Sequence, residues 1–184
     1  MIYKTFQKVS NVCQLLDKSK YYPTQTNSGI TFTNNGDGTI TLNGTATGHA
    51  QFLVRQGIHC KDNHKYLVKG SPSGGGYNLY RLTTSVYEDG SYVTGFSDSG
   101  SGNISNALLG SYTIIVFIDI YKGQTVSNLV FKPQLFDLTE MYGAGHEPTT
   151  VEQFRQDFPD EMYDYSPYCF VKSYRTLLKA SNVC

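Results

Sequence analysis

The sequence has no tryptophan, and only 16% of its 184 residues are charged, compared with roughly a quarter in ordinary soluble proteins. Its 15 basic and 15 acidic residues cancel, and no basic run gives the electrostatic pattern of a nucleic-acid-binding protein. The longest strongly apolar run, Ile114–Ile118, is too short to span a bilayer. The amino-terminal residues also lack the continuous apolar segment of a secretory signal. We therefore expect neither nucleic-acid binding nor membrane insertion.

Metal-binding and catalytic patterns are missing as well. The four cysteines form no CxxC pair and no metal-ligand spacing. We expect free thiols in a protein assembled in a reducing cytoplasm, with a disulfide between Cys13 and Cys184 left open as an alternative. The four histidines are scattered and pair with no nucleophile, and His59 and His64 around Cys60 match no common metal site. We expect no enzyme activity and no cofactor. The cysteines are Cys13, Cys60, Cys169 and Cys184.

Tyrosine, serine, threonine, asparagine and glycine take the place of the missing charges. The segment Gly29–Gly44 alternates apolar and threonine residues on both sides of Asn34–Gly38, which predicts a β-hairpin with its turn at those five residues. The asparagine and aspartate oxygens of this turn resemble a calcium ligand set. Turn chemistry accounts for all five residues without a metal, so we expect no structural calcium.

Further short strands follow along the chain, separated by turns rich in glycine and serine. The longest, Ser111–Tyr121, is apolar on both faces and is typical of a central strand buried on both sides. Eight or more short strands with one late helix predict an all-β fold, an antiparallel jelly-roll-type β-sandwich with a short C-terminal helix and extended terminal arms. The other predicted strands are Gln51–Arg55, Lys65–Lys69, Tyr77–Thr83, Ser85–Tyr87 and Tyr92–Phe96.

The tract from Asn128 to Pro159 changes from strand to helix. It begins with alternating apolar residues, continues through a loop at Tyr142–Pro148, and ends in an amphipathic segment that includes Phe154 and Phe158. Thr149 stands three residues before Glu152, which predicts a capping box at the start of this helix. We expect this tract to close and orient the domain.

Two parts of the chain resemble a known family. The run FKPQLFDLTEMYGAGHEPTTVEQFRQDFP, with the tyrosine-rich Tyr163–Pro167 after it, and the upstream run Leu15–Thr47 resemble tail and minor structural proteins of phages and prophages of gut bacteria. The resemblance covers about the first and last thirds of the chain. It implies a sandwich of the carbohydrate-binding-module type carried on a virion, and no active site. Assembly in the host cytoplasm followed by lysis would then replace an export signal.

The two ends of the chain repeat each other. Tyr3–Cys13 reads YKTFQKVSNVC and Tyr174–Cys184 reads YRTLLKASNVC, with seven of eleven positions identical at an offset of 171 residues. Repetition at about one domain length indicates either a remnant of a tandem array or two arms with equivalent roles in one assembly, packed on neighbouring subunits or paired side by side. Both alternatives favour an assembly component.

These observations lead to two alternative hypotheses about function. In the first, the chain is a virion fibre, decoration or tail component that binds copies of itself and other virion proteins. We divide it into an arm (1–14), a sandwich (15–136), a loop–helix–loop brace (137–168) and a second arm (169–184). In the alternative, the chain is an adhesin that recognises host-surface carbohydrate, because tyrosine rings stack on sugars. The candidate assembly residues are Tyr3, Phe6, Cys13, Tyr142, Phe154, Phe158, Tyr174, Leu177 and Cys184; the candidate glycan ligands are Tyr77, Tyr80, Arg81, Tyr87 and Tyr92.

Overall fold

A computed structural model describes the backbone of residues 4–166 and 170–178 and the side chains of residues 12–166. Strands are the main elements of the chain. One short 3-10 helix lies early in the chain, and two short α-helices lie late in it. The elements are β1 (Lys4–Val12), η1 (Lys18–Lys20), β2 (Gln25–Asn27), β3 (Ile30–Asn34), β4 (Ile40–Thr45), β5 (Ala50–His59), β6 (Tyr66–Lys69), β7 (Tyr80–Glu88), β8 (Ser91–Asp98), β9 (Asn103–Ile104), β10 (Thr113–Ile120), β11 (Thr125–Phe131), β12 (Gln134–Asp137), α1 (Leu138–Tyr142), α2 (Val151–Asp157) and β13 (Phe170–Leu178).

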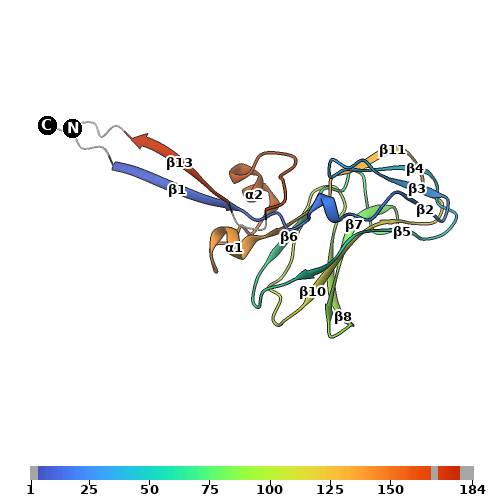
Figure 1. Cartoon of the computed structure of the whole chain (residues 1–184), viewed down its shortest axis with the longest axis horizontal. Coiled ribbons are helices and arrows are strands. Elements are labelled where there is room, and N and C mark those ends of the chain that lie inside the picture. The colour runs from blue at the N-terminus through green and yellow to red at the C-terminus, as the bar shows by residue number, and fades with distance from the viewer. Residues whose placement is uncertain (1–3, 167–169, 179–184) are drawn as a thin grey trace.

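The body of the molecule is an antiparallel β-sandwich, which confirms the predicted all-β fold class (Figure 1). One sheet has the strand order β5-β10-β7-β8, and the main core lies between it and two further sheets, β11-β4-β3-β2 and β12-β6-β9. Alternate residues of each strand point inward, as with Phe52 and Val54 on β5, while Gln51 and Arg55 point outward. Phe32 of the second layer stacks on Phe52 across the core, with ring centroids 5.4 Å apart.

The predicted hairpin is formed by β3 and β4, joined by the turn Asn34–Gly38. The carboxylate of Asp37 accepts hydrogen bonds from the backbone N–H and the hydroxyl of Thr39, and the Asn34 side chain accepts one from the N–H of Gly36. These hydrogen bonds lower the pKa of Asp37 below its usual value. The turn therefore uses its polar side chains for its own backbone, as turn chemistry predicts.

The longest predicted strand is central, as expected, but it is not buried on both faces. β10 lies between β5 and β7, and its inward residues Ile114, Val116 and Ile118 are fully buried. The outward residues Ile115 and Phe117 are only partly buried. The prediction of two buried faces is therefore wrong, because the continuous apolar run reflects a half-covered outer face rather than a third layer of structure.

The tract after β12 folds back onto its own chain and builds a second apolar cluster beside the main core. Phe154 and Phe158 of the α2 region are buried there against Phe136, together with Val12 from the end of β1. The capping box of α2 is one residue later than predicted, since Thr150 and Gln153 exchange the two bonds. The prediction of Thr149 and Glu152 is wrong because Thr149 lies before the cap, where its N–H donates to the Gln153 side chain.

The first and last described strands form a separate two-stranded ribbon. β1 pairs with β13 in antiparallel register, from Lys4 opposite Leu178 to Val12 opposite Phe170, without a bulge. Figure 1 shows this ribbon projecting from the side of the sandwich near α1 and α2, and the register places the pair of Lys4 and Leu178 at its far end. From here on, the arm means this ribbon of β1 and β13. Lys4–Lys8 of the first repeat therefore pairs with Tyr174–Leu178 of the second.

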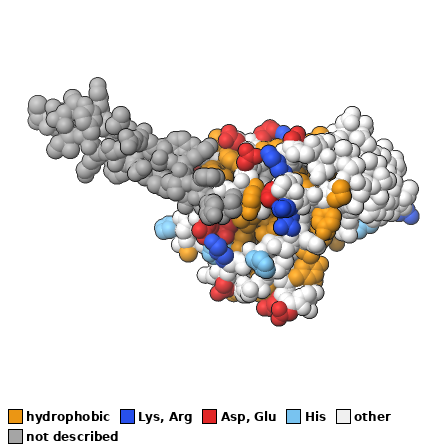
Figure 2. Space-filling view, in the orientation of Figure 1, with side chains coloured by type: hydrophobic (Ala, Val, Ile, Leu, Met, Phe, Trp, Pro, Cys, Tyr) orange, Lys and Arg blue, Asp and Glu red, His pale blue; other side chains and the backbone are white. Residues whose placement is uncertain are grey.

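On the face in Figure 2, acidic and basic side chains are interspersed near the base of the arm, as expected for a chain with a formal net charge of zero. Among the described residues, no helix has the length and apolar character needed to cross a bilayer.

Candidate functional site

The outer face of the sheet β5-β10-β7-β8 carries an aromatic group with a buried carboxylate beneath it. Tyr77, in the loop before β7, has 71% of its surface exposed. The guanidinium carbon of Arg81 lies 4.7 Å from the centre of its ring, and Tyr121 lies beside it with centroids 6.0 Å apart. His49 also stacks on Tyr121, with ring centroids 4.7 Å apart. We call Tyr77, Arg81, Tyr121, His49 and the carboxylate of Asp119 the tyrosine platform.

Asp119 holds the platform together. It lies on β10 directly opposite Gln51 of β5 and Arg81 of β7, and only 2% of its surface is exposed. Its carboxylate accepts hydrogen bonds from Gln51 Nε2 at 2.8 Å, Thr83 Oγ1 at 2.8 Å and Arg81 Nε at 3.4 Å. His49 Nε2 lies 3.3 Å from the same carboxylate. These contacts satisfy a buried charge that would otherwise be costly.

Arg81 links the carboxylate to the rings. Its Nη2 donates to the hydroxyl of Tyr121 at 2.8 Å while its Nε faces Asp119. Nη1 has no hydrogen-bond partner among the described residues. A cation held over an exposed ring stabilises the position of that ring by a cation–π contact. Chemically, the platform offers a preorganised aromatic face, with hydrogen-bonding groups of both kinds next to it.

The structure brings together only some of the predicted glycan residues. Tyr77 and Arg81 belong to the platform. Tyr80 turns toward the core, where its ring meets Phe131 edge-on at 6.1 Å and its hydroxyl donates to the Ser73 carbonyl at 2.7 Å. Tyr87 and Tyr92 form an edge-on pair at 6.0 Å beside the β7–β8 turn, at the other end of these strands from Tyr80 and Arg81.

The sequence analysis did not single out His49, Asp119 or Tyr121. A signal for two of them was present, since an aspartate followed by a tyrosine two residues later interrupts the apolar run of β10 on its outward side. The contribution of His49 depends on the pairing of β5 with β10, which no local pattern predicts.

The assembly residues of the C-terminal tract lie inside the chain. Phe154 is fully buried, Phe158 is 4% exposed, and the hydroxyl of the half-buried Tyr142 donates to Asp157 at 3.1 Å. Burial next to Asp157 raises the pKa of Tyr142 well above its usual value. These three side chains therefore stabilise the fold of the tract against the second cluster.

The remaining assembly candidates lie in or beyond the arm. Phe6, Tyr174 and Leu177 occupy β1 and β13, whose backbone is described but whose side chains are not. Tyr3 and Cys184 lie outside the described residues. Cys13 follows β1, is 2% exposed and is disulfide-bonded, so the expectation of a free thiol is wrong for this residue. Cys60 is a free, buried thiol, as expected, and burial raises its pKa to about 12.

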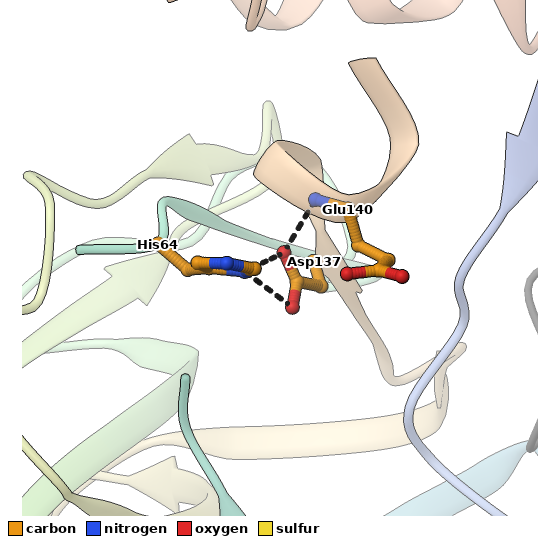
Figure 3. A group of neighbouring side chains, drawn as sticks. All are labelled: His64, Asp137 and Glu140. Carbon is orange, nitrogen blue, oxygen red and sulfur yellow. Dashed lines mark hydrogen bonds and ion pairs between the residues drawn. The ribbon is translucent and has the colours of Figure 1, made fainter. Parts of the chain in front are cut away.

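Three potential metal ligands meet at the start of α1 (Figure 3). His64 Nδ1 lies 2.8 Å and 2.9 Å from the two oxygens of Asp137, and the ligand atoms of His64, Asp137 and Glu140 all lie within 4.8 Å of one another. Asp137 also caps α1 by accepting from the N–H of Glu140 at 2.9 Å. The carboxylate of Glu140 pairs with Lys61 at 2.6 Å. A cation would have to displace both the His64 proton and the Lys61 ammonium, so the cluster is explained as a link between α1 and the residues before β6.

Lys69 is the buried cation of the second cluster. Its ammonium lies 5.4 Å from the ring centre of Tyr163 and 5.7 Å from those of Phe136 and Phe154, and it donates to the Asp160 carbonyl at 3.1 Å. Burial, with repulsion from Arg155 as a smaller cause, lowers the pKa of Lys69 to about 8. It borders an open cavity of about 570 Å³. Because three rings surround the amine, we assign Lys69 a structural role in the second cluster.

Comparison with known proteins adds no relative. No family model, no curated protein and no solved structure matches this chain.

Proposed function

We propose that this chain is a structural subunit of a phage virion, a fibre, decoration or tail component that joins copies of itself and other virion proteins through the arm. The observation that carries the proposal is the arm itself. A two-stranded ribbon alone is at best marginally stable in water, and its outer edges offer rows of backbone groups for another strand. The virion setting comes from the family resemblance of Leu15–Thr47 and of the tract that ends at Pro159.

The main core and the second cluster, as far as side chains are described, are built from residues between Val12 and Tyr163. Among the described residues, no strand pairs with the outer edge of β1 or of β13, so both edges remain for contacts with a neighbour. Disulfides persist in oxidising surroundings, so the bonded Cys13 at the base of the arm suits a particle released from the host cytoplasm by lysis.

Multi-angle light scattering over a concentration series tests the assembly. We expect defined oligomers of the full chain and monomers of a chain that lacks residues 1–11 and 170–184, with circular dichroism showing that the shortened chain keeps its sheet structure. Tyr77→Ala is the matched control, since it removes an exposed ring far from the arm and should leave the oligomers intact. A full chain that stays monomeric at every concentration would refute the proposal.

The tyrosine platform favours a second function, recognition of host-surface carbohydrate. Aromatic faces stack on the apolar faces of sugar rings, while charged and amide groups bind hydroxyls. Tyr77 supplies the exposed face, and Arg81 supplies a free donor next to it. A glycan array should show binding that Tyr77→Ala abolishes and that Tyr92→Ala preserves, since Tyr92 is 63% exposed on the β7–β8 hairpin away from the platform. Equal loss in both variants, or no binding by the full chain, would argue against this function.

A further inference from the structure

The arm has one edge whose partner can be identified, given that the chain assembles as proposed above. β13 pairs with β1 along one edge, and no strand pairs with its other edge in the part of the chain that the structure describes. The outer edge of β13 is thus an open row of backbone donors and acceptors. Such an edge binds an added strand through main-chain hydrogen bonds.

The second half of β13 is also the beginning of the C-terminal repeat. β13 covers Phe170–Leu178, and the copy of Tyr3–Cys13 begins at Tyr174. Tyr174–Leu178 therefore belongs to two patterns at once. As the end of β13, this segment pairs with β1. As a copy of Tyr3–Gln7, it resembles the segment that begins β1, which in turn pairs with β13.

The two pairings use opposite edges of the same strand. In an antiparallel ladder, the N–H and C=O of one residue point to one neighbour and those of the next residue point to the other side. Paired residues of β1 and β13 are both even-numbered or both odd-numbered, as with Lys4 and Leu178 or Thr5 and Leu177. The repeat offset of 171 is odd. A residue of β1 whose backbone groups face β13 thus corresponds to a residue of Tyr174–Leu178 whose backbone groups face away from β1. The copy would therefore hydrogen-bond through the outer edge of β13.

We infer that this outer edge binds β13 of a second copy of this chain, with the C-terminal repeat taking the place that β1 occupies within one copy. The register of β1 then transfers directly. Thr176 of one copy corresponds to Thr5 and lies opposite Leu177 of the second copy, and Arg175 corresponds to Lys4 and lies opposite Leu178 of the second copy.

The exchange costs little because the two strands are similar. Two of the five residues of Tyr174–Leu178 are identical to Tyr3–Gln7, and two more are the mild exchanges Lys4/Arg175 and Phe6/Leu177, so β13 of the second copy loses its own β1 and gains a similar strand. Exchange of an equivalent element between protomers is a low-cost route to association. The contact joins different edges of the two copies, so it is head-to-tail. Copies linked in this way form an open row, which suits a fibre or tail component.

Cysteine cross-linking tests the register. The donor is the full chain with Thr176→Cys, and the acceptor carries Leu177→Cys in a chain without residues 1–11, whose β13 has no β1 to release. We expect a donor–acceptor disulfide under mild oxidation, identified by mass spectrometry of the linked peptides. The slipped control uses an acceptor with Leu178→Cys, which should give several-fold less product because a one-residue shift turns the thiol to the other face.

The outcomes separate this inference from the proposed function. A full-length acceptor with Leu177→Cys should form the same product more slowly, since its own β1 must leave first, and this variant guards against misfolding of the shortened chain. Equal yields from the matched and slipped acceptors, or no product while light scattering still shows oligomers, would overturn the strand exchange and leave assembly standing. Monomers throughout would overturn both.

Discussion

Lys69 is the residue whose charge should respond most clearly to pH. Its folded-state pKa of about 8 is lower than the 10.5 of a free lysine, so between these values the unfolded chain binds more protons than the folded chain. Stability then rises with pH in this window. From pH 8 to 9.5 we expect the free energy of unfolding in urea to rise by about 1–2 kcal/mol relative to a variant without this amine.

The matched variant for this prediction is Lys69→Met, which keeps an unbranched side chain among the same three rings. Its free energy of unfolding should not rise from pH 8 to 9.5 and should fall somewhat, because burial raises the pKa of Cys60 to about 12 and the unfolded chain loses that thiol proton first. Tyrosine ionisation begins to matter above this range, because burial raises the pKa of Tyr21 and Tyr142 and the unfolded chain loses those protons first. A parallel rise in the wild type and in Lys69→Met would show that another group causes it.

Gln134 is fully buried, and neither end of its side-chain amide has a hydrogen-bond partner among the described residues. A buried polar group without a partner is destabilising, and an apolar residue of similar shape removes that cost. We expect Gln134→Met to raise the free energy of unfolding by about 1 kcal/mol. Denaturant titration measures this change.

Gln14 is the control for Gln134. Its side-chain oxygen accepts from the N–H groups of Leu16 at 3.0 Å and Leu135 at 3.1 Å, and it is also buried. Gln14→Met should therefore lose stability, by about 1–3 kcal/mol. The same sign of change in both variants would contradict this explanation.

Single residues also mark the limit of prediction from sequence for the platform. Tyr77 and Arg81 could be singled out because loop tips and tyrosines are common ligand positions. Tyr80, only three residues from Tyr77, points to the core instead, since alternation along β7 decides which side chains face outward. His49 joins the group only through the pairing of β5 with β10.

Among the elements, α2 gives a sharp test of its corrected start. Thr150 and Gln153 form the capping box. We expect Thr150→Ala to lower the free energy of unfolding by about 1 kcal/mol. Glu152→Ala should change it little, because the Glu152 side chain is mostly exposed and meets Arg155 only at 4.0 Å. Thermal or urea unfolding that ranks Glu152→Ala as the costlier variant would restore the cap predicted from the sequence.

The sequence predicted elements best where the local chemistry is decisive. The hairpin β3–β4 follows from alternation and from a turn whose residues bond their own backbone. The short strands β2 and β9 and the helix α1 were missed, because two to five residues carry too little periodicity. For α1 the decisive contact is the Asp137 cap held by His64, 73 residues away in sequence.

For the whole molecule, the repeat showed that the two ends are related, and the structure adds that they pair with each other. The pairing of β1 with β13 closes a loop of almost the whole chain, and no local pattern specifies such a contact. The parity of the repeat offset becomes meaningful only with this register. The arm is therefore where sequence and structure must be combined.

The most direct measurement for assembly through the arm is amide hydrogen exchange at low and high protein concentration. If copies join there, the amides of residues 170–178 should exchange more slowly as the concentration rises, because a new strand covers their open edge. The amides of β10 in the sandwich should not change. Exchange in 170–178 that is independent of concentration, in a sample that still forms oligomers, would place the contact elsewhere and contradict the account.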